Sequence, residues 1–326
     1  MQNLSKGRCG TWIILLCSLC IIELQQPANA IVLYLTLIGD RGIASLDTAT
    51  GAMSRVCSTP SEGGPDSLLF DTDGRIIYSE PQAGAVRRFD PSNRSTELLA
   101  SGMTQDKSFG PHDLALEPDG SSVLVSDVAS GRIYRINLTT KALTILKTFP
   151  GGHPAGLIYD NEGHLFVNLW RGPVVELNPK TGTVLQRSPE LEELDGLTFD
   201  SSTHKLWAVS YRGSLYILDP EKLAAGVNRI PLPAAKADGI AADGKGDIFV
   251  VITGNDGMIY RYSVANKTFQ SVGTIIRPDD VAPLSGFRPA LSSNNQVQIS
   301  ELVPKIAQPN GINICFPQER RRDKGA

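Results

Sequence analysis

Short runs of alternating apolar and polar residues fill the chain and predict a protein built mainly from β-strands. The clearest runs occupy residues 113–118, 121–128, 131–138 and 142–147. Period-two alternation rich in β-branched side chains is typical of strands that bury one face. Asp-Gly and Ser-Gly pairs separate these runs, and such pairs favour the tight turns of β-hairpins. This stretch therefore predicts one antiparallel sheet of four strands.

The same pattern recurs along the chain. Each copy opens with a short phrase that leads into an apolar residue of its first strand, and we call this residue the marker. The markers are Leu68, Leu114, Leu157, Leu197, Ile240 and Val281, at spacings of 40 to 46 residues. Four strands at this period are typical of one blade of a β-propeller.

The two ends of the repeat region complete one further blade. Residues 31–56 contain three strands with no first strand before them, whereas Val281 begins a first strand with no regular blade after it. We therefore predict an all-β, six-bladed β-propeller over residues 31–285, with four-stranded antiparallel blades. The N- and C-terminal strands share one blade, and this closure leaves no exposed sheet edge.

Residues 1–30 have the features of a secretory signal peptide. Lys6 and Arg8 precede an apolar run over residues 11–22, and a small-residue cleavage site ends at Ala30. The apolar run is too short to span a bilayer. We predict a protein of the secretory pathway, secreted or lumenal, with no membrane anchor after cleavage. Residues 286–326 are expected to form a C-terminal tail.

Cleavage leaves two cysteines, Cys57 and Cys315, in an oxidising compartment. A disulfide between them would tether the tail to the first blade, and two free buried thiols are the alternative. Glycosylation sequons occur at Asn93, Asn137 and Asn266, each just after the third strand of a repeat. Glycans would then lie on one face of the propeller.

The opposite face is predicted to bind a small-molecule substrate, because the loops before first strands and after second strands meet there around a concave mouth. The net charge of −3 and an isoelectric point near 5.9 argue against a nucleic-acid partner. The oligomeric state is not determined by these features.

Histidine, aromatic and arginine side chains gather in these loops. His112 and His153 align at the same point of neighbouring blades, before the first strand, and aromatic-arginine pairs follow the second strands of two consecutive blades. Aromatic faces beside guanidinium groups suit a flat, oxygenated ligand whose oxygens gain negative charge. The predicted catalytic residues are His112, His153, Arg171 and Arg212. The predicted substrate-binding residues are Trp170, Tyr211, Asp113 and Asn168.

Two alternatives for these residues stay open. An Asp at the start of a first strand can accept backbone N–H groups instead of binding substrate. The arginines can instead form ion pairs at the rim, with Glu80, Asp127 or Asp256 as partners.

The phrases DGLTFD (195–200) and DGIAAD (238–243) resemble the senescence-marker-protein/gluconolactonase superfamily of six-bladed propellers, over essentially the whole mature chain. Lactonases of that superfamily hold a divalent ion with a Glu, an Asn and an Asp, and here Asp195 or Asp238 matches the Asp. The N-terminal Glu motif is missing, and the Pro-Asn-Gly motif at 309–311 lies in the tail. The resemblance implies, as an alternative function, a lactonase with Asp66, Asp195 and Asp238 around a cation such as Ca²⁺ or Zn²⁺.

The departure from that metal pattern, together with the signal peptide, makes the chain most similar to secreted fungal members of secondary-metabolite pathways. Some of these are hetero-Diels-Alderases that join a tropolone-type or polyketide-derived quinone methide to a terpene. Such a reaction needs orientation and a few hydrogen bonds, without a metal or a covalent nucleophile. The first hypothesis is therefore a metal-free enzyme of natural-product biosynthesis with no cofactor. A non-catalytic, ligand-binding propeller is a further alternative.

Overall fold

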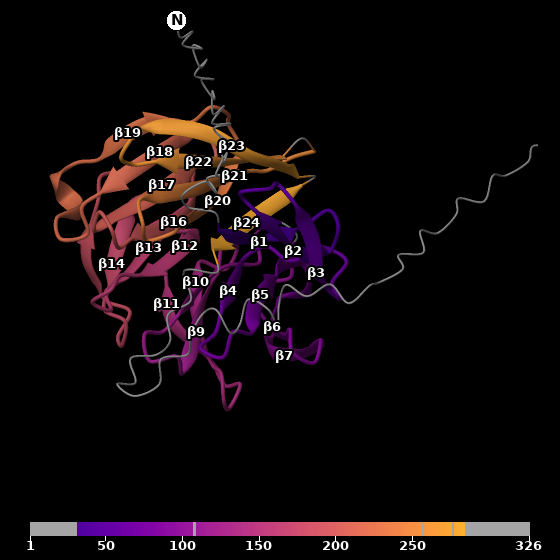
Figure 1. Cartoon of the computed structure of the whole chain (residues 1–326). Helices are drawn as coiled ribbons and strands as arrows, with labels where there is room; N and C mark the ends of the chain where they lie inside the picture. The colour runs from indigo at the N-terminus through magenta and orange to yellow at the C-terminus, as the bar shows by residue number, and fades with distance from the viewer. Residues whose placement is uncertain (1–30, 107–108, 256, 276, 284–326) are drawn as a thin grey trace, which may run out of the picture.

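The structure, a computed structural model, describes residues 31–106, 109–255, 257–275 and 277–283. These residues form six four-stranded antiparallel sheets arranged around a central axis (Figure 1). The predicted six-bladed propeller is confirmed. Each blade runs from an inner strand, which carries the marker residue, to an outer strand at the rim.

In five of the blades, the strands are arranged from the inner to the outer edge in the order in which they occur along the chain. The β4–β7 blade contains β4 (Leu68–Phe70), β5 (Ile76–Glu80), β6 (Ala85–Asp90) and β7 (Ser95–Ser101). The β8–β11 blade contains β8 (Pro111–Leu116), β9 (Ser122–Asp127), β10 (Arg132–Asn137) and β11 (Leu143–Thr148). The β12–β15 blade contains β12 (Pro154–Tyr159), β13 (Leu165–Leu169), β14 (Val174–Leu177) and β15 (Val184–Arg187). The β16–β19 blade contains β16 (Leu194–Asp200), β17 (Lys205–Ser210), β18 (Ser214–Leu218) and β19 (Asn228–Pro231). The β20–β23 blade contains β20 (Ala237–Ala242), β21 (Asp247–Ile252), β22 (Gly257–Ser263) and β23 (Thr268–Ile275). Two short 3₁₀ helices, η1 (Pro81–Ala83) and η2 (Leu223–Ala225), lie in connections.

The closing blade joins the two ends of the propeller, as the repeat count predicted. It contains β24 (Pro278–Pro283), β1 (Val32–Leu37), β2 (Gly42–Asp47) and β3 (Met53–Ser58). β24 pairs antiparallel with β1, with Val281 opposite Leu35 (Figure 1). A strand from each end of the propeller therefore completes one sheet, and backbone hydrogen bonds close the ring.

The hydrophobic core is divided among the six interfaces between neighbouring blades. Each of six buried clusters draws its side chains from two adjacent sheets. In one cluster Leu35 of the closing blade packs with Phe249 of the β20–β23 blade. This arrangement explains the strand pattern, because both faces of every sheet are covered and strands such as β5 and β9 are buried along their whole length.

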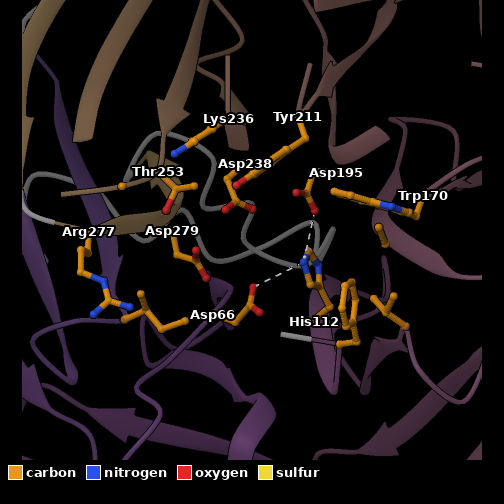
Figure 2. A pocket seen from close by; sticks show the side chains of 15 residues that line it. Asp66, His112, Trp170, Asp195, Tyr211, Lys236, Asp238, Thr253, Arg277 and Asp279 are labelled. Carbon is orange, nitrogen blue, oxygen red and sulfur yellow. Dashed lines mark ion pairs between the residues drawn. The ribbon is translucent and has the colours of Figure 1, made fainter. Parts of the chain in front are cut away.

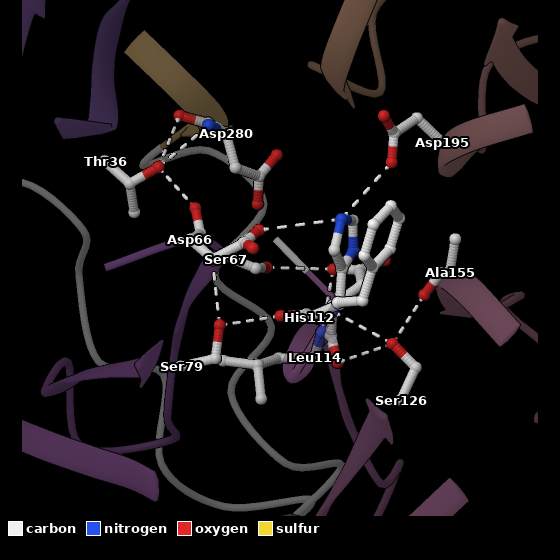
Figure 3. Close-up of polar contacts among 12 residues, drawn as sticks. Thr36, Asp66, Ser67, Ser79, His112, Leu114, Ser126, Ala155, Asp195 and Asp280 are labelled. Carbon is white, nitrogen blue, oxygen red and sulfur yellow. Dashed lines mark hydrogen bonds and ion pairs between the residues drawn. The ribbon is translucent and has the colours of Figure 1, made fainter. Parts of the chain in front are cut away.

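Hydroxyl groups connect neighbouring blades near the axis (Figure 3). The Ser126 Oγ accepts a hydrogen bond from the Asp113 N–H of its own blade at 2.9 Å and donates to the Ala155 carbonyl of the next blade at 2.6 Å. Ser79 makes the same pair of bonds with the Ser67 N–H and the His112 carbonyl. Each hydroxyl therefore fixes the start of one inner strand relative to the next.

Several predictions from the sequence concern residues outside the described part of the chain. The signal peptide (1–30), the tail (286–326) and Cys315 lie there, so the disulfide with Cys57 stays a prediction. Cys57 itself is buried on β3. The three sequons all lie at or in the turn between a third and a fourth strand, and their glycosylation stays a prediction. No helix in the described residues has the length and apolar character needed to cross a membrane.

The hydroxyl bridges give the first testable prediction. Replacing Ser126 with Ala removes one buried donor and acceptor, leaving the Asp113 N–H and the Ala155 carbonyl without that partner. We expect the free energy of unfolding to fall by about 1–3 kcal/mol. Denaturant unfolding measures the change. The exposed Ser54→Ala variant is the matched control and should stay within about 0.5 kcal/mol of wild type. Equal stability of both variants would contradict the role of the bridge.

Candidate functional site

An axial cavity of about 510 Å³ is lined by one residue from the start of every inner strand. This residue is always the second before the marker, and we call the six residues the axial ring. The ring consists of Asp66, His112, Ala155, Asp195, Asp238 and Asp279. The repeat therefore brings four carboxylates and one imidazole to a single cavity (Figure 2).

A local irregularity of the inner strands accompanies the ring. In five of the six blades, the pairing between the inner strand and the second strand is interrupted by a register shift. The shift spans the ring residue and the residue that follows it. Such bulges re-aim side chains and are frequent next to binding sites. Glycine follows the ring residue in three blades because there is no space for a side chain: a Cβ at Gly156 would lie 2.6 Å from the Leu197 nitrogen of the next blade.

His112 bridges two ring carboxylates across the cavity. Its Nε2 lies 3.2 Å from Oδ1 of Asp195 and 3.8 Å from Oδ1 of Asp66 (Figures 2 and 3). Burial acts to lower the pKa of His112, but the charges of Asp66 and Asp195 outweigh burial and raise this pKa well above its ordinary value. The two neighbouring acids therefore favour the protonated imidazole. Its buried Nδ1 has no hydrogen-bond partner in the part of the chain that the structure describes.

The carboxylates of the ring resist ionising together. Burial raises the pKa of Asp66 and of Asp238 well above the usual range, and the charges of neighbouring ring acids add to the effect. Burial likewise raises the pKa of Asp279 to about 6. Closely packed acids with raised pKa values are typical of functional sites, because a bound cation or a catalytic proton makes the arrangement favourable.

The mouth of the cavity combines aromatic rings with two cations. The rings of Trp170 and Tyr211 have centroids 5.9 Å apart, at an interplanar angle of 52°. Lys236 and Arg277 also line the cavity (Figure 2), each four residues before a marker and each with a left-handed backbone, uncommon for a residue other than glycine. Neither forms an ion pair with another described residue. Both are free to bind an anionic or oxygen-rich ligand.

The two arginines predicted to be catalytic lie outside the cavity lining. Their side chains are 72% (Arg171) and 60% (Arg212) exposed, and each has one Nη2 beside Oε1 of Glu193, at 3.2 Å and 2.9 Å. The rim ion pair that the sequence left open therefore exists, with Glu193 as the partner in place of Glu80, Asp127 or Asp256. The aromatic neighbours Trp170 and Tyr211 line the cavity instead.

His153 and His112 are not equivalent, which corrects the sequence alignment of the two residues. His112 lies two residues before its marker and His153 lies four before its own, so only His112 is in the ring. The Nδ1 of His153 lies 2.9 Å from the Val128 carbonyl oxygen, a contact between neighbouring blades.

Asp113 and Asn168, predicted to bind substrate, lie between blades. The Asp113 carboxylate accepts hydrogen bonds from the Leu157 N–H at 2.7 Å and from the Ser67 hydroxyl at 2.9 Å. The Asn168 amide donates to the Leu194 carbonyl at 2.9 Å. Both side chains bind groups of a neighbouring blade, and the Leu157 N–H bound by Asp113 is in keeping with the backbone-binding alternative.

A divalent cation fits the ring. One donor atom from each of His112, Asp195 and Asp238 lies within 4.8 Å of the other two, and the carboxylates lack a Lys or Arg ion-pair partner among the described residues. Carboxylate oxygens with one imidazole nitrogen suit Zn²⁺ or Mn²⁺, and Ca²⁺ through oxygen alone. This donor set differs from the Glu, Asn and Asp that the family resemblance implied, because His112 takes part.

The sequence did not single out three cavity residues as site residues: Asp279, Lys236 and Arg277. The repeat contained the signal for Asp279, since it occupies the same position before a marker as Asp195 and Asp238. The signal for Lys236 and Arg277 was weaker. Their shared position four residues before a marker was visible, but the left-handed backbone that both residues adopt was not.

The fold and the ring together define a six-bladed propeller with an acidic axial cavity. Pentonolactonase XacC of Haloferax volcanii is 24% identical over 252 residues, covering 72% of this chain and 82% of that protein. No protein-family model matches the chain.

Solved propellers share the fold at low sequence identity. The nidogen/laminin complex contains a chain with a TM-score of 0.65 and 14% identity, covering 78% of this chain and 98% of that one. A streptogramin B lyase has a TM-score of 0.58 and 16% identity, covering 74% of this chain and 78% of that one. Virginiamycin B lyase from Staphylococcus aureus has a TM-score of 0.57 and 14% identity, covering 77% of this chain and 83% of that one. At these identities the solved structures show the propeller fold alone. They give no support to the fungal Diels-Alderase subtype.

A half-buried acid next to the ring gives a prediction about pH. Asp280 is on β24, and its Oδ2 accepts a hydrogen bond from the Leu68 N–H of β4 at 3.4 Å. Burial, reinforced by Asp113, raises its pKa to about 8, against about 3.9 in an unfolded chain. The folded state therefore keeps a proton that the unfolded state loses. The stability from Asp280 is full below about pH 4 and is lost as the pH rises through about 8.

We expect Asp280→Asn, which cannot ionise, to gain stability relative to wild type between pH 5 and pH 9. Denaturant unfolding with chelator present measures this difference. Asp119 is the control, because it is exposed and hydrogen bonds from Ser121 lower its pKa. The difference between Asp119→Asn and wild type should be constant over this range. A constant difference for Asp280→Asn as well would rule out its titration.

Proposed function

We propose that the chain is a divalent-cation-dependent hydrolase of small lactones that acts in the axial cavity. The observation that carries the proposal is the axial ring, in which four carboxylates and one imidazole from equivalent positions face one cavity of about 510 Å³. A cavity of this size is in the range of small-molecule sites. The cluster of buried acids suits a cation better than it suits a metal-free reaction of two apolar partners.

His112, Asp195 and Asp238 would hold the cation. The bound ion supplies Lewis-acid polarisation of a lactone carbonyl. In the metal-free protein the raised pKa of His112 keeps a proton on the imidazole, between Asp66 and Asp195. The cation and this proton compete for the same nitrogen, so the affinity for metal should increase with pH.

Other residues of the cavity have separate roles in this proposal. Asp279, with a pKa of about 6, is largely ionised at neutral pH and is a suitable general base for the attacking water. Water adds to the carbonyl carbon, the ring C–O bond breaks, and the ring oxygen takes up the proton, which gives a hydroxy acid. Trp170 and Tyr211 present apolar surfaces to the substrate ring, and Lys236 and Arg277 bind oxygens of the substrate and the product carboxylate.

The similarity to pentonolactonase XacC supports the reaction class and makes a five-carbon sugar lactone the first substrate to assay. We also propose that the protein acts on this small molecule in the secretory pathway, as its N-terminal residues predict. Cycloaddition depended on Arg171 and Arg212, whose guanidinium groups are paired with Glu193 at the rim.

Metal-dependent turnover tests the proposal. Protein dialysed against chelator should hydrolyse a pentonolactone only after Ca²⁺, Mn²⁺ or Zn²⁺ is added, and a pH-stat follows the acid released. Asp195→Asn should lower kcat/KM by on the order of 100-fold or more, because it removes a cation ligand. Asp279→Asn should lower kcat by a similar factor and leave the affinity for metal within about threefold of wild type, as expected for a base that does not hold the ion.

Asp119→Asn is the matched control, since Asp119 is exposed in a turn on the opposite face, and it should keep full activity. Metal binding without hydrolysis of any lactone would favour the non-catalytic, ligand-binding propeller. Equal activity with and without chelator would overturn the proposed role of the cation.

A further inference from the structure

A second cavity, of about 110 Å³, lies on the face opposite the axial cavity, between two adjacent blades. Its lining includes Asp160, Glu162 and His164 from the turn between β12 and β13, and His204 from the turn between β16 and β17. Two of the four histidines of the chain are therefore together at this cavity. We call Asp160, Glu162, His164 and His204 the interblade cluster.

Each member of the interblade cluster has a donor atom within 4 Å of a donor atom of another member. The Nδ1 of His164 lies 2.8 Å from Oδ2 of Asp160 and 3.8 Å from Oε2 of Glu162. The Nε2 of His204 lies 3.9 Å from the other oxygen of Glu162. Donor atoms of Asp160, Glu162 and His164 all lie within 4.8 Å of one another.

Three of the other five blades place an arginine at the equivalent position of their third strand. Arg88 of β6 lies 3.4 Å from Asp71, Arg135 of β10 lies 2.8 Å from Glu117, and Arg261 of β22 lies 2.5 Å from Asp247. Asp71 and Glu117 lie in the connection between the first and second strands of their blades, and Asp247 is the first residue of the second strand, so each arginine neutralises an acid at the same end of its own blade.

The β12–β15 blade has an acid where those arginines stand. Glu176 of β14 pairs with Phe166 of β13, as Arg88 pairs with Ile77 and Arg135 with Leu124. Glu176 is only 8% exposed, lines the second cavity, and accepts one hydrogen bond, from the Gln186 amide at 2.8 Å. No Lys or Arg is among the described residues that line this cavity. Glu176 therefore adds a buried acid at a position where three other blades supply an arginine.

We propose that a first-row divalent transition metal, Zn²⁺ in particular, binds the interblade cluster and replaces the missing arginine charge. His164, His204 and Glu162 are the ligands. Imidazole nitrogens with a carboxylate select Zn²⁺ over Ca²⁺ or Mg²⁺, which prefer oxygen ligands throughout.

Asp160 and Glu176 support the ligands. Asp160 accepts the Nδ1–H of His164 and leaves Nε2 to bind the ion, an arrangement common at zinc-binding histidines. Glu176 contributes charge beneath the ligands. Because His204 comes from the neighbouring blade, the ion joins the β12–β15 and β16–β19 blades, and its role is structural.

Zinc binding to the full chain tests the proposal, with Asp195→Asn as the parent so that the axial ring does not contribute. Calorimetry after chelator treatment should find one Zn²⁺ per chain, with a higher Tm in its presence. Introducing His204→Asn into the Asp195→Asn parent should weaken zinc binding at least about tenfold and abolish the rise in Tm. Co²⁺ in place of Zn²⁺ should give a visible absorption band that His204→Asn loses.

Glu176→Arg is the second variant, because it introduces the residue type that three other blades carry at this position. It should fold, lose zinc binding and keep the lactone hydrolysis of an otherwise wild-type chain. This variant also decides the question if His204→Asn does not fold. The proposal is overturned if the Asp195→Asn parent binds no zinc, or if either added variant binds it as tightly as the parent. Because the readout is zinc binding without the axial ring, the result does not depend on lactonase activity.

Discussion

Ser79 and Ser126 each hold one hydroxyl between two blades, and the position of the axial ring depends on these contacts. Each hydroxyl accepts a backbone N–H from the inner strand of its own blade and donates to the carbonyl of the ring residue in the next. Thr36 makes the corresponding contacts with the Asp280 N–H and the Asp66 carbonyl. A buried N–H or carbonyl without a partner is costly. The requirement to satisfy these groups therefore fixes Asp66, His112 and Ala155, whose side chains face the cavity.

This geometry has an electrostatic consequence, because an acid at a repeated position faces its equivalents in other blades. Donor atoms of Asp195 and Asp238 lie within 4.8 Å of each other, where two full charges repel by about 3–4 kcal/mol at an effective dielectric constant of about 20. Protons offset part of this repulsion in the metal-free protein, on His112 and on carboxyls with raised pKa values. A bound divalent cation offsets more of this repulsion than the protons do. Because the cation takes the place of these protons, the affinity of the ring for metal depends on pH.

The repeat allowed the propeller, its closure and the loops of the cavity to be predicted from sequence, because marker spacing and strand alternation are local patterns. Side-chain direction was harder to predict. Trp170 lines the cavity, whereas the next residue of the same turn, Arg171, pairs with Glu193 at the rim, and the sequence does not show which way each side chain of a turn points. His153 and His112 differ by two positions relative to the marker, and only His112 lines the cavity. The bulge at the start of the inner strand contributes to this difference, and the sequence does not reveal it.

Residues that depart from the repeat also determine the geometry of the site. Ala155 is the one ring position without a polar side chain, and it lies between the blades of His112 and Asp195. With only a methyl group there, the imidazole of His112 comes within 3.2 Å of Asp195, a residue two blades away. A longer side chain at Ala155 would occupy that space and separate the imidazole from the carboxylate. The small residue in the ring is therefore what joins equivalent positions of separate blades into one site.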